Sequence, residues 1–201
     1  MENEPLIDEA LKSELSALYQ AENRHYHGLA HIKAMLALAA ECRDLIHDPE
    51  AVEAAIWFHD AIYDSPAKDN EAKSAELAED RLAGRVSPKR MAWIAAVINA
   101  TATHQVPSSE DTKAANDAAL LLDMDLAILG AEPGAFDAYE KAVRREYGWV
   151  EEPMWRAGRT AVVKAFLARP HIFHTEPFRE RFEAQARENL NRSLQNLQGP
   201  A

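Results

Sequence analysis

The chain has 201 residues, a formal net charge of −11 and a single cysteine. A domain of this size buries roughly 70% of the surface that its unfolded chain exposes, so its core needs no disulfide. The acidic charge excludes a protein that binds a nucleic-acid polymer through clustered Lys and Arg. It still allows a small phosphorylated partner that is bound by a few local cations.

The N-terminal sequence MENEPLIDEA has neither the basic region nor the apolar region of a secretory signal. The apolar runs are shorter than the roughly 18 to 20 residues that span a bilayer. Cys42 has no second cysteine with which to form an internal disulfide. We therefore expect a cytoplasmic protein without a membrane partner.

Apolar residues recur at three- and four-residue spacing along nearly the whole chain, and glycines are few. This pattern, with much Ala, Leu and Glu, is typical of helices and not of strands. In chain order, the expected helices cover Glu9 to Gln20, Leu29 to Leu45, a segment opened by Asp48-Pro49, Asp69 to Leu82, Ser87 to His104, Thr112 to Leu129, Pro133 to Tyr147, Glu152 to Ala168 and Thr175 to Leu197. We predict an all-α bundle of about eight to ten helices.

His59 and Asp60 stand side by side in the apolar segment AAIWFHDAIYD. Burying these two groups costs several kcal/mol, on the order of the penalty for an unpaired charge, unless something compensates them. A divalent cation is the simplest compensation, and a hydrogen-bonded core His with Asp paired to a distant Arg is the alternative. Neighbours on a helix point about 100° apart, so the pair would hold an ion that lies between their two directions.

Two further pairs supply possible partners for this doublet. His27 and His31 in RHYHGLAHIKAM share a face if the segment is helical, or they are surface or capping histidines. Asp123 and Asp125 interrupt the apolar run AALLLDMDLAIL and face about 200° apart on a helix, so at most one reaches the same ion. A mixed set of imidazoles and carboxylates suits Mn, Fe, Co, Ni or Zn, and suits Mg less naturally.

The order H…HD…D resembles that of the HD superfamily of metal-dependent phosphohydrolases, all-helical proteins named for the His-Asp doublet. The strings RHYHGLAHI, AIWFHDAIYD, DNEAKSAELA and LLDMDLAILG are similar to a bacterial group of predicted HD-domain phosphohydrolases, and the resemblance covers roughly residues 20 to 190. It implies one HD-type domain over 1–201, with a core at about 20–130 and C-terminal helices at about 131–197 packed on it. The metal ligands that it implies are His31, His59, Asp60 and Asp125, with Asp123 as the second choice for the last.

The resemblance also suggests roles for residues beyond the metal ligands. The string YHGLAHIKAM is similar to the YHNxxHAxDV signature of cyclic-nucleotide phosphodiesterases, which would make His27 the donor of a proton to the leaving oxygen. Some HD proteins have a further His at a position comparable to His104, where it binds a second metal or the substrate phosphate. Interaction with the helix dipole is the alternative for His104.

Three further residues are candidates for contacts with substrate or solvent. Glu71 is a candidate for one of three roles: to accept a proton, to orient a water on the metal or to cap its helix. Arg24 and Lys33 are candidate phosphate-binding cations, although most Lys and Arg are surface charges.

The sequence thus predicts a divalent-metal-dependent phosphohydrolase that acts on a small phosphorylated molecule, nucleotides included, through a metal-activated water. His27, Asp60 and Glu71 are its candidate catalytic residues. Two alternatives are an HD-like di-iron oxygenase and a non-catalytic helical ligand-binding or regulatory module with a structural metal. A homodimer is the default expectation for a bacterial-type protein of this size.

Overall fold

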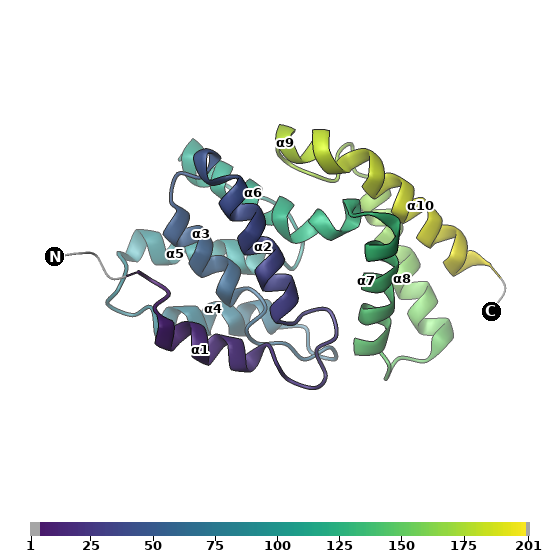
Figure 1. The fold of residues 1–201 in the computed structure, drawn as a ribbon, viewed down its shortest axis with the longest axis horizontal. Coiled ribbons are helices and arrows are strands. Elements are labelled where there is room, and N and C mark those ends of the chain that lie inside the picture. Colours follow the sequence, from purple (N-terminus) through teal and green to yellow (C-terminus); the bar gives the residue numbers. More distant parts are fainter. Residues whose placement is uncertain (1–4, 200–201) are drawn as a thin grey trace. The chain divides into compact units, whose positions relative to one another are not determined.

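The computed structural model describes residues 5–199, and all regular structure within them is helical (Figure 1). The α-helices are α1 (Glu9–Leu18), α2 (Leu29–Glu41), α3 (Pro49–Phe58), α4 (Asn70–Arg81), α5 (Pro88–Ala100), α6 (Thr112–Leu126), α7 (Pro133–Glu146), α8 (Glu152–Leu167), α9 (Glu176–Phe178) and α10 (Ala184–Gln198). Three short segments have other helical geometry: η1 (Arg43–Leu45), η2 (Ala127–Gly130) and the π-helical η3 (Arg179–Glu183). The predicted all-α class is confirmed.

The chain divides into two compact units, one up to Asp125 and the other from Leu126. In the first unit α3 packs against α1, α2, α4 and α5. Seven of the ten α3 residues are buried, and such a mostly apolar helix belongs in the middle of a bundle. The first unit is therefore built around α3. The prediction of one domain over the whole chain stays a prediction.

In the second unit α10 packs against α8 and the short η2 segment. The Asn189 side chain donates hydrogen bonds of 2.9 and 2.8 Å to the carbonyls of Leu129 and Ala131. Gly130 lies between these residues, and a Cβ there would come within 2.6 Å of Phe182. Gly130 therefore allows the η2 segment to approach Phe182 closely. It also lies directly after Leu129, where the sequence pattern predicts the helix to end.

Several helices end earlier than the apolar pattern predicts. The helix expected to reach Leu45 ends at Glu41, and the one expected to reach His104 ends at Ala100. The last predicted helix is divided into α9, η3 and α10. Within η3, the Glu183 carboxylate accepts the backbone N–H groups of Ile172 and Phe173, in the loop before α9. Such tertiary hydrogen bonds set helix ends that the periodicity of the sequence does not contain.

The described part of the chain has no helix that combines the length and apolar character needed to cross a membrane.

The Asp117 carboxylate holds the segment before α3. It is 2% exposed and accepts the backbone N–H groups of His47, at 2.9 Å, and of Asp48, at 2.8 Å. We expect Asp117→Ala to lower the free energy of unfolding by about 3 kcal/mol, since two N–H groups lose a charged acceptor. Asp44→Ala, at an exposed position nearby, should change it by less than about 0.5 kcal/mol. Urea unfolding measures both, and equal effects would contradict this role for Asp117.

Candidate metal centre

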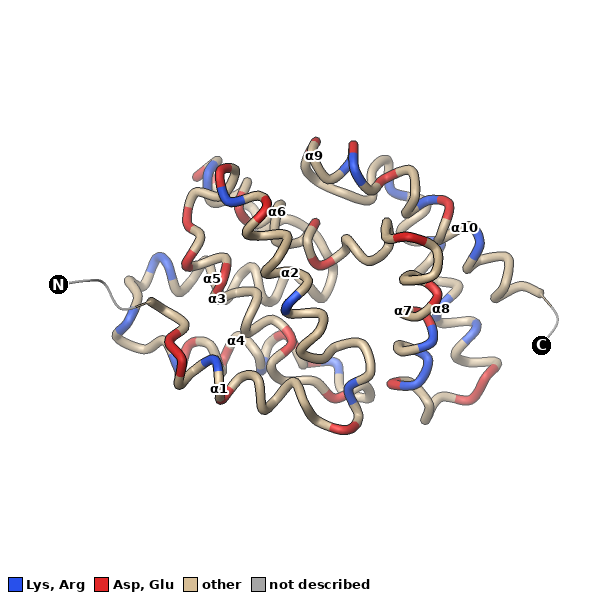
Figure 2. Tube along the Cα trace, in the orientation of Figure 1, with Lys and Arg blue, Asp and Glu red and all other residues tan. Residues whose placement is uncertain are grey.

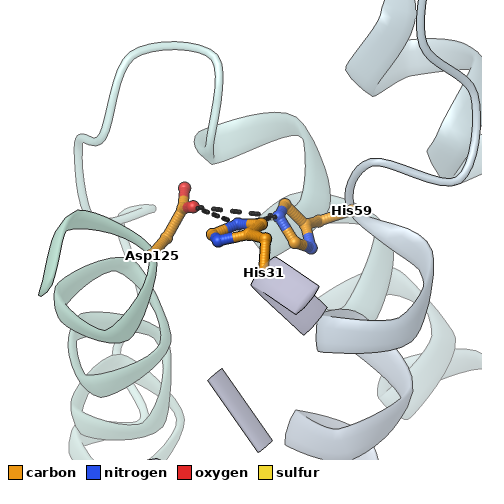
Figure 3. A group of neighbouring side chains, drawn as sticks. All are labelled: His31, His59 and Asp125. Atoms are coloured by element: carbon orange, nitrogen blue, oxygen red, sulfur yellow. Dashed lines mark hydrogen bonds and ion pairs between the residues drawn. The ribbon is translucent and has the colours of Figure 1, made fainter. Parts of the chain in front are cut away.

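Side chains from two helices and from the end of a third meet at one point in the first unit. His31 comes from the first turn of α2, His59 follows the last residue of α3, and Asp125 lies near the end of α6 (Figure 3). Their donor atoms all lie within 4.8 Å of one another. The two Nε2 atoms are 3.2 Å apart, and Asp125 Oδ1 lies 3.0 Å from His31 Nε2 and 3.8 Å from His59 Nε2.

Asp60 adds a second carboxylate to this group. Its Oδ2 lies 3.1 Å from His59 Nε2 and 3.9 Å from His31 Nε2. The four predicted ligands therefore come together. Asp123, the second choice for the last ligand, is fully buried on α6 but is not part of the group of donors.

The sequence pattern predicts the doublet inside a helix, and this prediction is wrong. Helix α3 ends at Phe58, and His59 is its C-cap residue. Asp60 lies in the turn that follows. The argument from a 100° angle between helical neighbours therefore does not apply, and the turn lets both side chains approach the same point.

Each histidine has its other ring nitrogen held by a hydrogen-bonding group. His59 Nδ1 lies 2.8 Å from the Ile56 carbonyl, and His31 Nδ1 lies 3.2 Å from the Tyr26 hydroxyl. A proton on Nδ1 that donates to such a group leaves the lone pair on Nε2, as in metal-binding histidines. Tyr26 had no role in the sequence analysis, although it stands beside His27 in the string RHYHGLAHI.

The carboxylates give this site a strong preference for positive charge. Burial works to lower the pKa of His59, but Asp60 and Asp125 outweigh it and raise the pKa to about 9. Burial works to raise the pKa of Asp60, but His59 lowers it below its usual range. The pKa of Asp125 is likewise held well below its usual range against burial, mainly by hydrogen bonds from His104 and His31. The site therefore keeps its carboxylates ionised and stabilises a nearby cation.

His104 lies against the group of ligands. Its Nε2 is 2.9 Å from Asp125 Oδ2, the oxygen that does not face His31. Its φ of 52° is the only positive value at a non-glycine residue among those described. A non-glycine residue in this region is uncommon and often occurs at functional sites. Its predicted contact with a second metal or with phosphate stays a prediction.

His27 lies beside the ligands and close to Asp60. Its ring stacks on that of Tyr63 with 4.4 Å between centroids, and its charge contributes to the low pKa of Asp60. The ring is half-buried. This placement suits a group that donates a proton, and that role remains a prediction. The sequence analysis did not identify Tyr63, which carries no signal beyond its place three residues after the doublet.

Arg24 joins the two segments that carry His27 and Asp60. Its Nη1 donates to the carbonyls of His27, at 2.9 Å, and Asp60, at 2.6 Å, and its Nη2 donates to Ala61 O at 2.8 Å. Its guanidinium also lies over the rings of two tyrosines. These contacts give Arg24 a positioning role, and its predicted contact with a substrate phosphate stays a prediction.

Lys33 and Glu71 are the remaining candidates. Lys33 is exposed on α2, and Glu71 is half-buried in the first turn of α4. Among the described residues, no hydrogen bond or ion pair joins either side chain to the four ligands. Their predicted roles stay predictions.

The chemistry of the donors fits a divalent transition metal. Two imidazole nitrogens and two carboxylates match the preferences of Mn, Fe, Co, Ni or Zn better than those of Mg. Comparisons with protein-family models, with curated proteins and with solved structures returned no match.

The metal-free protein should lose about 3 kcal/mol of stability between pH 6.5 and pH 9. His59 with a raised pKa binds a proton in the folded chain that the unfolded chain releases, so this stabilisation is complete below pH 6.5 and disappears by pH 9. Urea unfolding of chelator-treated protein across this range measures the loss. The His59→Gln variant should lack this pH dependence, and the same slope in both proteins would contradict the assignment.

Arg24→Lys should weaken the binding of a divalent metal by roughly tenfold or more, as is common for partners that orient ligands. A lysine keeps the charge but cannot bridge three carbonyl groups in a fixed plane. Titration with Zn²⁺ or Mn²⁺ measures the affinity. Arg43→Lys, on exposed η1, is the matched control and should bind as the unchanged protein does. Unaltered affinity in Arg24→Lys would count against a positioning role.

Proposed function

We propose that the protein is a divalent-metal-dependent phosphohydrolase of the HD type, acting on a small phosphorylated molecule, nucleotides included. The observation that carries this proposal is the meeting of His31, His59, Asp60 and Asp125 at one point, from segments far apart in the sequence. Their order along the chain is the H…HD…D order, and the surrounding fold is all-helical.

The geometry supports a cation between the histidines. Two neutral imidazoles with lone pairs on Nε2 would repel one another at 3.2 Å. Both rings are buried, so water cannot easily relieve this repulsion. A metal ion accepts both lone pairs, and the carboxylates of Asp60 and Asp125 balance its two charges.

A bound divalent ion supplies a Lewis acid that polarises a phosphoryl oxygen and makes water a better nucleophile near neutral pH. The surrounding residues would position the ligands of the ion and supply a proton. His104 holds the outer oxygen of Asp125, and Arg24 fixes the turn that carries Asp60. His27, beside Asp60 and stacked on Tyr63, gives a proton to the leaving oxygen.

One observation favours an HD-like di-iron oxygenase as a second candidate. Asp125 presents Oδ1 to His31 and Oδ2 to His104, so Asp125 and His104 would be the residues to hold a second ion. Metal stoichiometry separates the candidates. A single ion per chain with turnover of phosphate esters supports the phosphohydrolase, whereas two irons and oxygen consumption support the oxygenase. Tightly bound metal without any turnover supports a structural ion in a binding module.

Asp60→Ala should remove both the bound metal and the hydrolysis of phosphate esters, because it deletes one of the two carboxylates that balance the ion. We expect activity to fall at least roughly a hundredfold, more than the loss of an outer partner costs. Elemental analysis and a panel of phosphomonoesters, cyclic diesters and nucleotides measure the two effects. Asp64→Ala, at an exposed position of the same segment, should retain metal and activity. Full activity in Asp60→Ala would overturn the proposal.

A further inference from the structure

The two units differ strongly in charge. The unit up to Asp125 has 11 Lys and Arg against 23 Asp and Glu, whereas the unit from Leu126 has 11 against 10. Figure 2 shows Lys and Arg on α7, α8 and α10 of the second unit. Half of the basic residues of an acidic protein are therefore in its shorter unit.

Five of these cations line one cavity of about 580 Å³ formed by α7, α8 and α10. They are Lys141, Arg144, Arg145, Arg156 and Arg192. Cavities that hold small molecules typically measure about 300–1,000 Å³, so this one is large enough for an organic ligand. The cavity lies entirely within the second unit, whereas the four proposed metal ligands belong to the first.

The two acidic residues of the cavity are already paired. Asp137 accepts a 2.6 Å hydrogen bond from Arg192. Glu140 is bound by Arg159, a half-buried residue outside the cavity lining, and by the hydroxyl of Ser193 at 2.8 Å. These carboxylates therefore do not neutralise the other four cations.

One further carboxylate is shared by two arginines. Glu152 lies 3.1 Å from Arg144 and 3.9 Å from Arg156. Lys141 and Arg145 are both exposed on α7, and among the described residues neither makes an ion pair. The cavity thus has a surplus of positive charge that a ligand with at least two negative charges would balance.

Neutral acceptors hold two of the arginines in place. Arg144 Nη1 donates to Tyr147 O at 2.7 Å and its Nη2 to Val150 O at 3.2 Å. Arg156 Nη2 donates to Gly199 O at 2.7 Å. Carbonyl groups orient a guanidinium without removing its charge, and each guanidinium has five N–H donors. The side chains are therefore arranged to bind an anion such as phosphate.

The cavity also has an aromatic surface. Trp155 lines it and is half-buried, with the Arg144 guanidinium 5.2 Å from its ring centroid. Phe136, nearly fully buried, lies on α7 in the same lining. The Trp155 ring also packs against that of Tyr147, with 5.6 Å between centroids. Tryptophan binds planar rings by offset stacking or edge-to-face contact.

We propose that this cavity binds a nucleoside diphosphate or triphosphate, with its phosphates at Lys141, Arg144 and Arg145 and its base at Trp155. Several phosphate groups match the surplus charge, and a base matches the aromatic surface. The ligand binds without a metal ion because the protein itself supplies the positive charge.

Isothermal titration of the metal-free full chain with ADP tests the proposal. We expect a single saturable site, and binding weaker by roughly tenfold or more in Lys141→Gln/Arg145→Gln, because two cations that face phosphate are lost. The matched control, Lys68→Gln/Lys164→Gln, removes two exposed lysines outside the cavity and should bind ADP as the unchanged chain does. Absence of saturable binding, or equal losses in both double variants, would overturn the proposal.

Two further measurements locate the base and the site. Trp155→Leu should weaken ADP binding and leave inorganic pyrophosphate binding intact, which also shows that the variant is folded. Pyrophosphate bound as tightly as ADP by the unchanged chain would contradict the role of Trp155. Asp60→Ala should keep full ADP affinity, and a loss there would place the nucleotide at the metal centre instead.

Discussion

The approach of two buried imidazoles is the interaction on which the first unit depends. His31 and His59 face each other through Nε2 at 3.2 Å, with 7% and 1% of their surfaces exposed. Asp60 and Asp125 place two negative charges around them. A buried charge without compensation costs several kcal/mol, on the order of a whole domain's margin of stability. A cation among these groups, such as a proton on His59, therefore stabilises the site.

Helix α3 brings this cluster together because both of its ends are fixed. At its start, the buried carboxylate of Asp117 accepts the backbone N–H of Asp48. Beyond its end, Arg24 binds the carbonyls of Asp60 and Ala61. Between these points the helix is mostly apolar and packs on four neighbours. Charged side chains bonded to backbone thus position the doublet, while the apolar core supplies most of the stability.

The helices could be predicted from the sequence, because periodicity depends on local residues, and the cost of burial singled out His59-Asp60. The choice of His31 and Asp125 as their partners rested on the resemblance to the HD superfamily. The end of α3 could not be predicted in this way. The apolar pattern continues through Ile62, yet the helix stops at Phe58. Contacts with distant residues hold the turn that follows: Arg24 binds its carbonyls, and the Ser74 hydroxyl accepts the N–H of Ile62 at 3.0 Å. The sequence does not show which of its polar groups will meet.

The two proposed sites present electrostatic potentials of opposite sign to a phosphorylated ligand. The carboxylates of Asp60 and Asp125 make the first site anionic, so it repels phosphate until a divalent ion neutralises them. The cavity lined by Lys141 and Arg145 is cationic by itself and attracts phosphate directly. In the proposed function, the first site would gain its affinity for phosphate from the same ion that promotes hydrolysis. The proposed nucleotide cavity would bind phosphate without promoting its hydrolysis, because none of its lining residues belongs to the proposed metal centre. The two proposed sites thus differ in charge: the anionic metal centre suits a metal-dependent reaction of a phosphate, and the cationic cavity suits binding of a phosphate alone.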